Sequence, residues 1–290
     1  MRIIIFLIFS SILFSKLLLA EGLELRDLIK SAEQGHAKTQ YSLALMYYKG
    51  QGAPQDDQEA VKWYRKAAEQ GIADAQLYLA MMYDLGQGVP RDYKESAKWY
   101  RKAAEQEQAD GKVQFILAII YARGKGVPRD EQEATKWYRK AAEQGMAEAQ
   151  YSLALQYDLK IGVLRDDQEA VKWYRKAAEQ GNAGAQLNLG SMYREGRGIH
   201  QSDQKAVTWF RKAAEQGNAD AQFRLGSMYG LGEGVPQDHK EAYAWSNVSA
   251  AQGHRQAVEL RLLFENRLSS KALNEAQELS NEYFNKYVKE

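Results

Sequence analysis

The chain has 290 residues, of which 45% are apolar, 11% are aromatic and four are prolines. This composition is typical of an ordered protein and excludes a chain that is disordered throughout. The 39 basic residues nearly balance the 38 acidic ones, so bulk charge gives no reason to expect nucleic acid as a partner. With no cysteine, the chain forms no disulfide and offers no thiol for lipid attachment.

The first twenty residues differ from the rest of the chain. Arg2 precedes an apolar run over residues 3–14, and acidic residues begin at Glu21. This order resembles a secretory signal peptide that is cleaved after Ala20. A retained membrane anchor is the alternative, but Lys16 interrupts the run before it reaches the roughly 20 apolar residues that span a bilayer. The sequence therefore predicts export to the periplasm, the cell surface or the medium, without a membrane span after signal removal.

Six tryptophans mark a repeat that fills most of the chain. Each lies in a phrase that reads Lys-Trp-Tyr-Arg-Lys-Ala-Ala-Glu-Gln in its best copies. They are Trp63, Trp99, Trp137, Trp173, Trp209 and Trp245, spaced 36 residues apart except for one step of 38. Such a period is typical of stacked two-helix units that bury their apolar faces against each other. The sequence predicts an all-α, right-handed superhelical solenoid of antiparallel two-helix repeats, with the tryptophans in its core.

The period also predicts the domain organisation. After the signal peptide (1–20), residues 21–36 form a capping half-repeat, and residues 255–290 form two capping helices that close the stack. Six repeats lie between them, at residues 37–72, 73–108, 109–146, 147–182, 183–218 and 219–254. We also expect a monomer.

Local signals place the helix ends within each repeat. The second helix of a repeat starts with Asp-x-x-Glu, as at Asp56, which is an N-cap pattern, and a glycine such as Gly71 follows its last turn. The connection between the two helices carries glycines and a proline, as in Gly-Gln-Gly-Val-Pro at 86–90. Lys160 and Leu164 replace glycine and proline in one copy, so we expect that loop to be looser or the local twist to differ.

The repeat resembles a known family. Residues 75–104 read Ala-Gln-Leu-Tyr-Leu-Ala-Met-Met-Tyr-Asp-Leu-Gly-Gln-Gly-Val-Pro-Arg-Asp-Tyr-Lys-Glu-Ser-Ala-Lys-Trp-Tyr-Arg-Lys-Ala-Ala. This segment resembles the Sel-one-like repeat (SLR) family, a branch of the tetratricopeptide-like solenoids, and the resemblance covers about residues 37–254. The ending Ala-Tyr-Ala-Trp-Ser-Asn at 242–247 resembles that of exported bacterial members. The resemblance implies an adaptor or scaffold for proteins, and some exported members engage host proteins such as secretory immunoglobulin A.

Function is sought where the copies differ. On the first helix of each repeat, the positions 15, 18 and 22 residues after the preceding tryptophan position share one stripe. They vary while their neighbours stay fixed, and in tetratricopeptide-like stacks such helices line the concave surface. We therefore predict that a protein or peptide binds there, with the larger side chains exposed. The alternative is that the stripe packs adjacent helices together. The candidate partner-binding residues are Tyr78, Met81, Leu85, Ile116, Arg123, Asn188, Glu195 and Arg224.

The chain offers few residues for catalysis. Its four histidines lie in or beside predicted turns without metal-binding spacing, which is typical of solvated turn residues. Ser202 and Lys205 match the Ser-x-x-Lys pattern of penicillin-recognising enzymes, but the companion motifs Ser-Asp-Asn and Lys-Thr-Gly are absent, and serine at a helix start is an ordinary cap. We predict no catalytic residue, cofactor or metal. A weak β-lactamase-like enzyme and a cell-envelope or peptidoglycan scaffold remain as alternatives.

Overall fold

A computed structural model describes residues 25–288 of the chain, so the predicted signal peptide lies outside the described residues. Within that range there are fifteen helices and no strand, which confirms the all-α class and the solenoid of helical repeats. The helices are α2 (Leu25–Glu33), α3 (Ala37–Lys49), α4 (Asp57–Glu69), α5 (Ala73–Leu85), α6 (Tyr93–Ala104), α7 (Gly111–Arg123), α8 (Glu131–Glu143), α9 (Ala147–Leu159), α10 (Asp167–Glu179), α11 (Ala183–Glu195), α12 (Asp203–Ala214), α13 (Ala219–Leu231), α14 (His239–Ala251), α15 (Arg255–Glu265) and α16 (Ser270–Tyr287).

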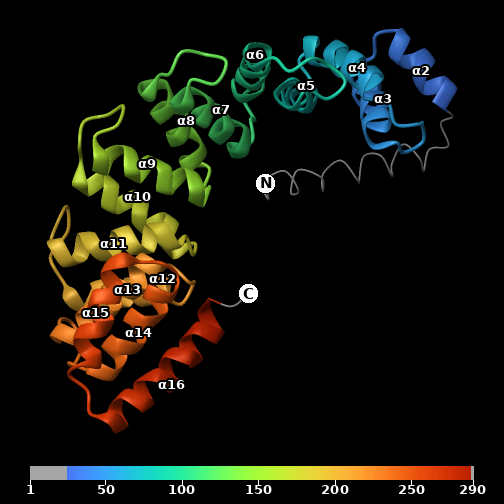
Figure 1. The fold of residues 1–290 in the computed structure, drawn as a ribbon. Helices are drawn as coiled ribbons and strands as arrows, with labels where there is room; N and C mark the ends of the chain where they lie inside the picture. The colour runs from blue at the N-terminus through green and yellow to red at the C-terminus, as the bar shows by residue number, and fades with distance from the viewer. Residues whose placement is uncertain (1–24, 289–290) are drawn as a thin grey trace. The chain divides into compact units, whose positions relative to one another are not determined.

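The described chain forms two compact units, the first ending at Trp137 and the second beginning at Tyr138. In the first unit each helix from α2 to α7 packs on the next, and in the second unit the same holds from α9 to α15 (Figure 1). We call α3, α5, α7, α9, α11 and α13 the A helices, and α4, α6, α8, α10, α12 and α14 the B helices. Within each unit, packing is therefore dominated by neighbours in sequence, as in a repeat stack.

Side-chain caps start the B helices as predicted. Asp56 Oδ1 accepts hydrogen bonds from the backbone N–H of Gln58 at 2.9 Å and of Glu59 at 3.0 Å. Four other aspartates act in the same way; they are Asp92, Asp130, Asp166 and Asp238. In α12 the cap is Ser202. A cap of this kind stabilises a helix by about 1 kcal/mol.

The loop from an A helix to its B helix requires glycine at two places. Gly86 ends α5 with φ of 73°, in the left-handed region. At Gly88 a Cβ atom would lie 2.1 Å from the carbonyl oxygen of Asp57, so no larger residue fits there. Close approach of this loop to the start of the preceding B helix brings one repeat into contact with the next.

The irregular loop after α9 keeps the same backbone geometry as its counterparts. Lys160 adopts φ of 58°, which is the conformation of glycine in the other copies. Ile161 N–H donates to the carbonyl of Gln156 at 2.9 Å, and Asp166 N–H donates to that of Tyr157 at 3.2 Å. These backbone hydrogen bonds match those of the other copies, so they give no support to the expected loosening of this loop. Lys160 instead carries the strain of a left-handed conformation.

The tryptophans are core residues, as predicted. Five of the six indoles are at most 4% exposed, and Trp209 is half-buried. Trp63 Nε1 donates to Glu59 Oε2 at 3.1 Å, and Lys66 Nζ lies 4.2 Å from the centre of the indole. In five of the six repeats a lysine lies over the indole in this way.

Buried glutamines connect successive repeats. The side-chain amide of Gln76 donates to the carbonyl of Ala68 at 3.0 Å, and its oxygen accepts from Gln106 Nε2 at 2.9 Å. In the second unit Gln186 makes the same two bonds, to Ala178 and with Gln216. The polar groups of these buried side chains are thus satisfied by neighbouring repeats.

The C-terminal helices close the second unit in an unequal way. The helix α15 follows α14 in the position of a seventh A helix and buries Ala257 and Phe264. The longer α16 packs on α14 (Figure 1). Its Tyr283 ring stacks on the Trp245 indole with centroids 4.3 Å apart, so α16 covers the outer side of the last B helix.

Candidate functional site

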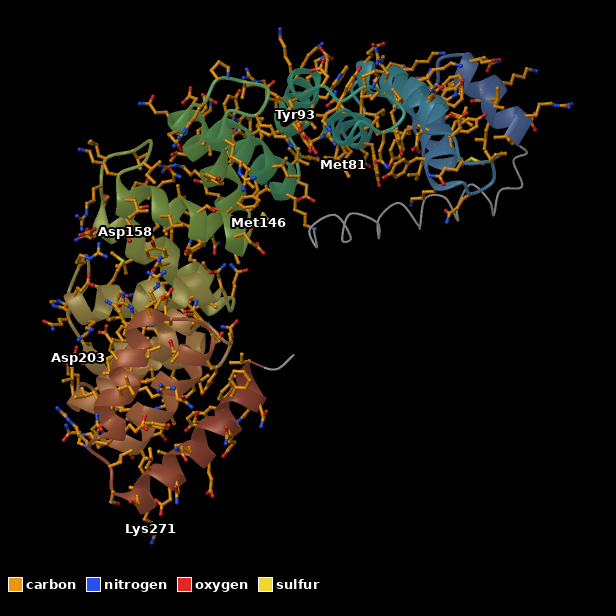
Figure 2. All side chains as sticks on the ribbon, viewed as in Figure 1. Met81, Tyr93, Met146, Asp158, Asp203 and Lys271 are labelled. Atoms are coloured by element: carbon orange, nitrogen blue, oxygen red, sulfur yellow. The ribbon has the colours of Figure 1, made fainter. Side chains whose placement is uncertain are left out.

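We call the predicted partner-binding positions, which lie 15, 18 and 22 residues after the preceding tryptophan position, the A-helix stripe. In the first unit some side chains of this stripe are exposed and others are buried in the core. Leu85 is 41% exposed and Arg123 is exposed, whereas Met81 and Ile116 are half-buried. Met81 lies on α5, one turn before Leu85 (Figure 2). These four predicted residues are accessible in whole or in part. A partner could contact them without unfolding the helices.

The structure contradicts the prediction that Tyr78 is exposed. Its side chain is only 9% exposed. The ring stacks on Tyr64 with centroids 5.2 Å apart and an interplanar angle of 3°. Tyr41 and Tyr48 lie on its other sides at 6.3 Å and 5.8 Å. The expectation of an exposed Tyr78 is therefore wrong, and the ring belongs to an aromatic cluster that joins α3, α4 and α5.

In the second unit, the predicted residues take part in polar networks. Asn188 is half-buried, and its Nδ2 donates to Tyr174 Oη at 3.0 Å. Glu195 is exposed, and its Oε2 accepts from Arg197 Nε at 2.8 Å. Arg224 is half-buried with its guanidinium 5.9 Å from the centre of a phenylalanine ring. These three side chains are thus polar or charged, and part of their interaction capacity is used within the unit.

Charged side chains link the end of one A helix to the loop of the next repeat. Arg197 Nη1 lies 2.6 Å from Asp158 Oδ1 and 3.4 Å from Asp167 Oδ1. Asp158 stands at the C-terminal end of α9 (Figure 2). Burial opposes the charge of Arg197, but hydrogen bonds to Asp158 and Glu195 outweigh this and raise the pKa of the guanidinium. Two further pairs have the same placement, namely Lys125 with Asp84 and Arg194 with Glu233.

Exposed leucines recur at the last position of the A-helix stripe. Leu85, Leu159 and Leu231 are 41%, 59% and 60% exposed, and each ends its helix. The intervening copies carry Lys49, Arg123 and Glu195 at this position. Leu159 and Leu231 are absent from the predicted site, although the alternation of leucine and charge in this column was readable in the sequence.

The residues considered for catalysis have structural contacts. Ser202 Oγ accepts from the backbone N–H of Lys205 at 3.4 Å and caps α12. His254 is not the solvated turn residue that we expected, because its side chain is 15% exposed and stacks on Phe223 with centroids 4.6 Å apart. Within residues 25–288 no three side chains that could ligate a metal come together. No helix in the same range combines the length and apolar character needed to cross a bilayer.

Comparison with known proteins identifies the repeat. The Sel1 repeat matches the chain six times, over residues 37–72, 73–107, 112–146, 147–182, 183–218 and 219–254. Residues 108–111, where the step between tryptophans is lengthened, fall outside these matches. No curated protein sequence matches the chain.

Two solved structures are similar over most of the chain. A protective antigen of uropathogenic Escherichia coli strains, with an SLR fold, is 34% identical with a TM-score of 0.59. That match covers 91% of this chain, but the chain spans only 64% of the antigen. A Sel1 repeat protein from Oxalobacter formigenes is 41% identical with a TM-score of 0.57, over 75% of this chain and 89% of that one. Repeat proteins of this kind generally serve as scaffolds for protein–protein interaction, and the chain belongs to the Sel1 repeat family.

Proposed function

We propose that the protein is an adaptor or scaffold that binds a protein or peptide through the variable A-helix stripe. One observation carries this proposal. Leu85, Leu159 and Leu231 are at least 41% exposed, and they lie on helices whose other apolar side chains are largely buried. Exposed apolar side chains that recur at the same position of a repeat are typical of sites of protein recognition.

The partner that fits this surface presents apolar and charged side chains in alternation. Burying the exposed part of each leucine would contribute affinity, at about 25 cal/mol per Å² of apolar area. The charged residues of the intervening repeats are Lys49, Arg123 and Glu195. They would orient the partner and speed its association more than they would raise its affinity. The surface within each unit therefore suits an extended or helical peptide segment. A host protein such as immunoglobulin is one class of partner that the family resemblance suggests.

Export is part of the proposal. The basic start and short apolar run of residues 1–20 support a signal peptide. Mass spectrometry of the protein isolated from its cells should find Glu21 as the first residue, and fractionation should place it in the periplasm, on the surface or in the medium. An intact Met1 on the protein recovered from the cytoplasm would contradict export.

Photo-crosslinking in living cells tests the binding surface. A photoreactive amino acid at Leu85, Leu159 or Leu231 should capture the same protein. The matched control places it at Lys62 or Lys172, which are exposed on B helices and lie outside the A-helix stripe. Equal capture from the B-helix positions, or capture from those alone, would contradict a site on the A helices.

The protein is proposed to act without catalysis. Ser202, the residue that a penicillin-recognising enzyme would use, caps α12. Incubation of the purified protein with a fluorescent penicillin should leave it unlabelled. Covalent labelling that disappears in a Ser202→Ala variant would show that the enzymatic alternative is correct.

A further inference from the structure

At one equivalent position of the loop between the A helix and the B helix, two repeats carry a basic residue that contacts the preceding repeat. In the second unit Arg197 lies between Asp158 and Asp167. In the first unit Lys125 Nζ lies 2.6 Å from Asp84 Oδ1 and 4.5 Å from the centre of the Tyr93 ring. Arg197 therefore pairs with two carboxylates of the preceding repeat, and Lys125 pairs with one carboxylate and one tyrosine of the preceding repeat.

The first repeat has the same framework without the cation. Tyr48 stands in the column of Asp84, Asp57 stands in the column of Tyr93, and Gln87 stands in the column of Lys125. The α3–α4 pair thus offers one carboxylate and one tyrosine, in exchanged positions. Gln87, which occupies the column of Lys125 and Arg197, is neutral.

The loop that bears Gln87 follows the same path as the loop that bears Arg197. Gln87 N–H donates to the carbonyl of Met82 at 3.0 Å, and Arg197 N–H makes the equivalent bond at 3.1 Å. The glycine after each residue lies against the carbonyl of the aspartate that starts the preceding B helix, Asp57 or Asp167. Position 87 is therefore placed next to Asp57 as position 197 is placed next to Asp167.

Two buried polar atoms at this place lack partners. Asp57 Oδ1 and Tyr64 Oη have no hydrogen-bond partner among the described residues, and Tyr64 is 0% exposed. The counterpart of Tyr64 in the second unit, Tyr174, donates to Asp158 at 3.1 Å. A buried acceptor without a partner costs about 1 to 3 kcal/mol, so a donor brought from outside would be stabilised here.

Aromatic rings complete the surroundings. The ring of Tyr64 lies 6.0 Å from Tyr41, 6.3 Å from Tyr48 and 5.2 Å from Tyr78, measured between centroids. Tyr48 is the half-buried member of this cluster. Burial raises the pKa of Tyr48, and the negative charge of Asp57 raises it further. Tyrosine faces attract ammonium and guanidinium groups.

We propose that Asp57 and the tyrosine cluster of Tyr41, Tyr48, Tyr64 and Tyr78 form a binding site for a cationic side chain, a lysine or an arginine, of a partner protein. The incoming cation takes the position that Lys125 and Arg197 occupy in two of the other repeats. It forms a charge-assisted hydrogen bond with Asp57 and lies against the face of Tyr48. This inference rests on the proposed function, since it names one group that the partner presents.

Titration with small probes tests the site without any partner protein. N-acetyl-arginine amide, N-acetyl-lysine amide and the neutral isostere N-acetyl-citrulline amide would be added to the full chain, with tyrosine ring signals followed by NMR. Both cationic probes, or one of them, should shift the signals of Tyr48 and Tyr64, and citrulline should not. The arginine and lysine arms identify which cation the site prefers. An equal response to citrulline, or no response to either cation, would overturn the proposal.

Two variants locate the binding. Asp57→Asn removes the negative charge and should weaken binding of the cationic probe at least tenfold. Gln87→Lys supplies a cation from the chain itself, so it should abolish probe binding and raise the Tm. Unchanged probe binding in Gln87→Lys would overturn the proposal even if Asp57→Asn failed to fold. Since no partner takes part, these results are independent of whether crosslinking finds one.

Discussion

The B helices α10 and α14 occupy equivalent places in the second unit but differ in what covers their tryptophan. In α10 the indole of Trp173 is flanked by two exposed lysines, with Lys172 Nζ at 5.3 Å and Lys176 Nζ at 4.5 Å from its centre. In α14 the corresponding residues are Ala244 and Val248, which are 0% and 1% exposed. The indole is buried in both helices, so the two helices differ in which residues pack over the indole.

In α14 the indole is covered by the helix α16. Tyr283 and Tyr287 of α16 lie 4.3 Å and 5.8 Å from the Trp245 indole, and Tyr283 Oη donates to both carboxylate oxygens of Glu241 at 3.1 Å. Further along, Asn247 Nδ2 donates to Ser280 Oγ at 2.7 Å. Replacing two lysines by small apolar residues therefore turns the solvent side of a B helix into a surface on which another helix packs.

The largest expected effect comes from removing the covered indole. Trp245→Ala should lower the free energy of unfolding by about 3 to 5 kcal/mol, because it leaves a cavity in the core and removes the ring on which α16 stacks. Urea denaturation followed by circular dichroism measures this. Trp209→Ala, at a half-buried indole, is the matched control and should cost less. Equal losses in the two variants would show that burial of the indole does not set its contribution.

Making α14 resemble α10 should release α16. In the double variant Ala244→Lys and Val248→Lys, two charges would be buried beneath α16 unless the helix left, so we expect it to detach at a cost of about 2 kcal/mol. Amide hydrogen exchange over residues 270–287 should become fast. The reverse change, Lys172→Ala with Lys176→Val, should alter stability by less than about 0.5 kcal/mol. Retained protection of α16 in the lysine variant would contradict the role given to these two positions.

The strained loop after α9 provides a pair of opposite effects. Lys160→Gly should raise the free energy of unfolding by about 1 kcal/mol, since glycine adopts the left-handed conformation without a clash. Gly196→Lys introduces lysine at the same column, where φ is 68°, and should lower it by a similar amount. Thermal unfolding of both variants measures the pair. A destabilised Lys160→Gly variant would mean that the lysine side chain has contacts worth more than the strain.

The smallest effect concerns the carboxylate beneath α16. Burial raises the pKa of Glu241, although the hydrogen bond from Tyr283 opposes this shift. The folded protein therefore keeps the proton to a higher pH than the unfolded chain, whose glutamate pKa is about 4.3. Stability contributed by this group is complete below that value and is lost as pH rises through the raised pKa, by less than about 1 kcal/mol. Glu241→Gln should remove this dependence in pH-dependent urea denaturation, and an unaltered slope would contradict it.

The sequence predicted the features that most repeats share. The buried indoles, the aspartate caps and the glycines of the loops follow from residues that recur in the same surroundings, so one repeat explains the next. Tyr78 was predicted wrongly because its surroundings are particular to the first unit. Asn188 occupies the same column as Tyr78 and is half-buried, whereas Tyr78 meets Tyr41, Tyr48 and Tyr64 on three sides.

The placement of α16 was also beyond the sequence reading. An amphipathic pattern predicts a helix with an apolar face, but it does not state which surface that face covers. The signal was present in α14, where Ala244 and Val248 replace the lysines of the repeat. The unpaired Asp57 likewise becomes visible only when the contacts of one repeat are compared with those of another.

The central claim is that recurring residues stabilise the fold while varying residues of the A helices bind the partner. It is tested most directly by a double variant, Leu85→Ala with Arg123→Ala, in which the free energy of unfolding and capture of the crosslinked partner are measured together. We expect stability to change by less than about 1 kcal/mol, because both side chains are exposed, and capture to fall at least tenfold. Undiminished capture, or a loss of stability as large as that of a buried residue, would contradict the claim.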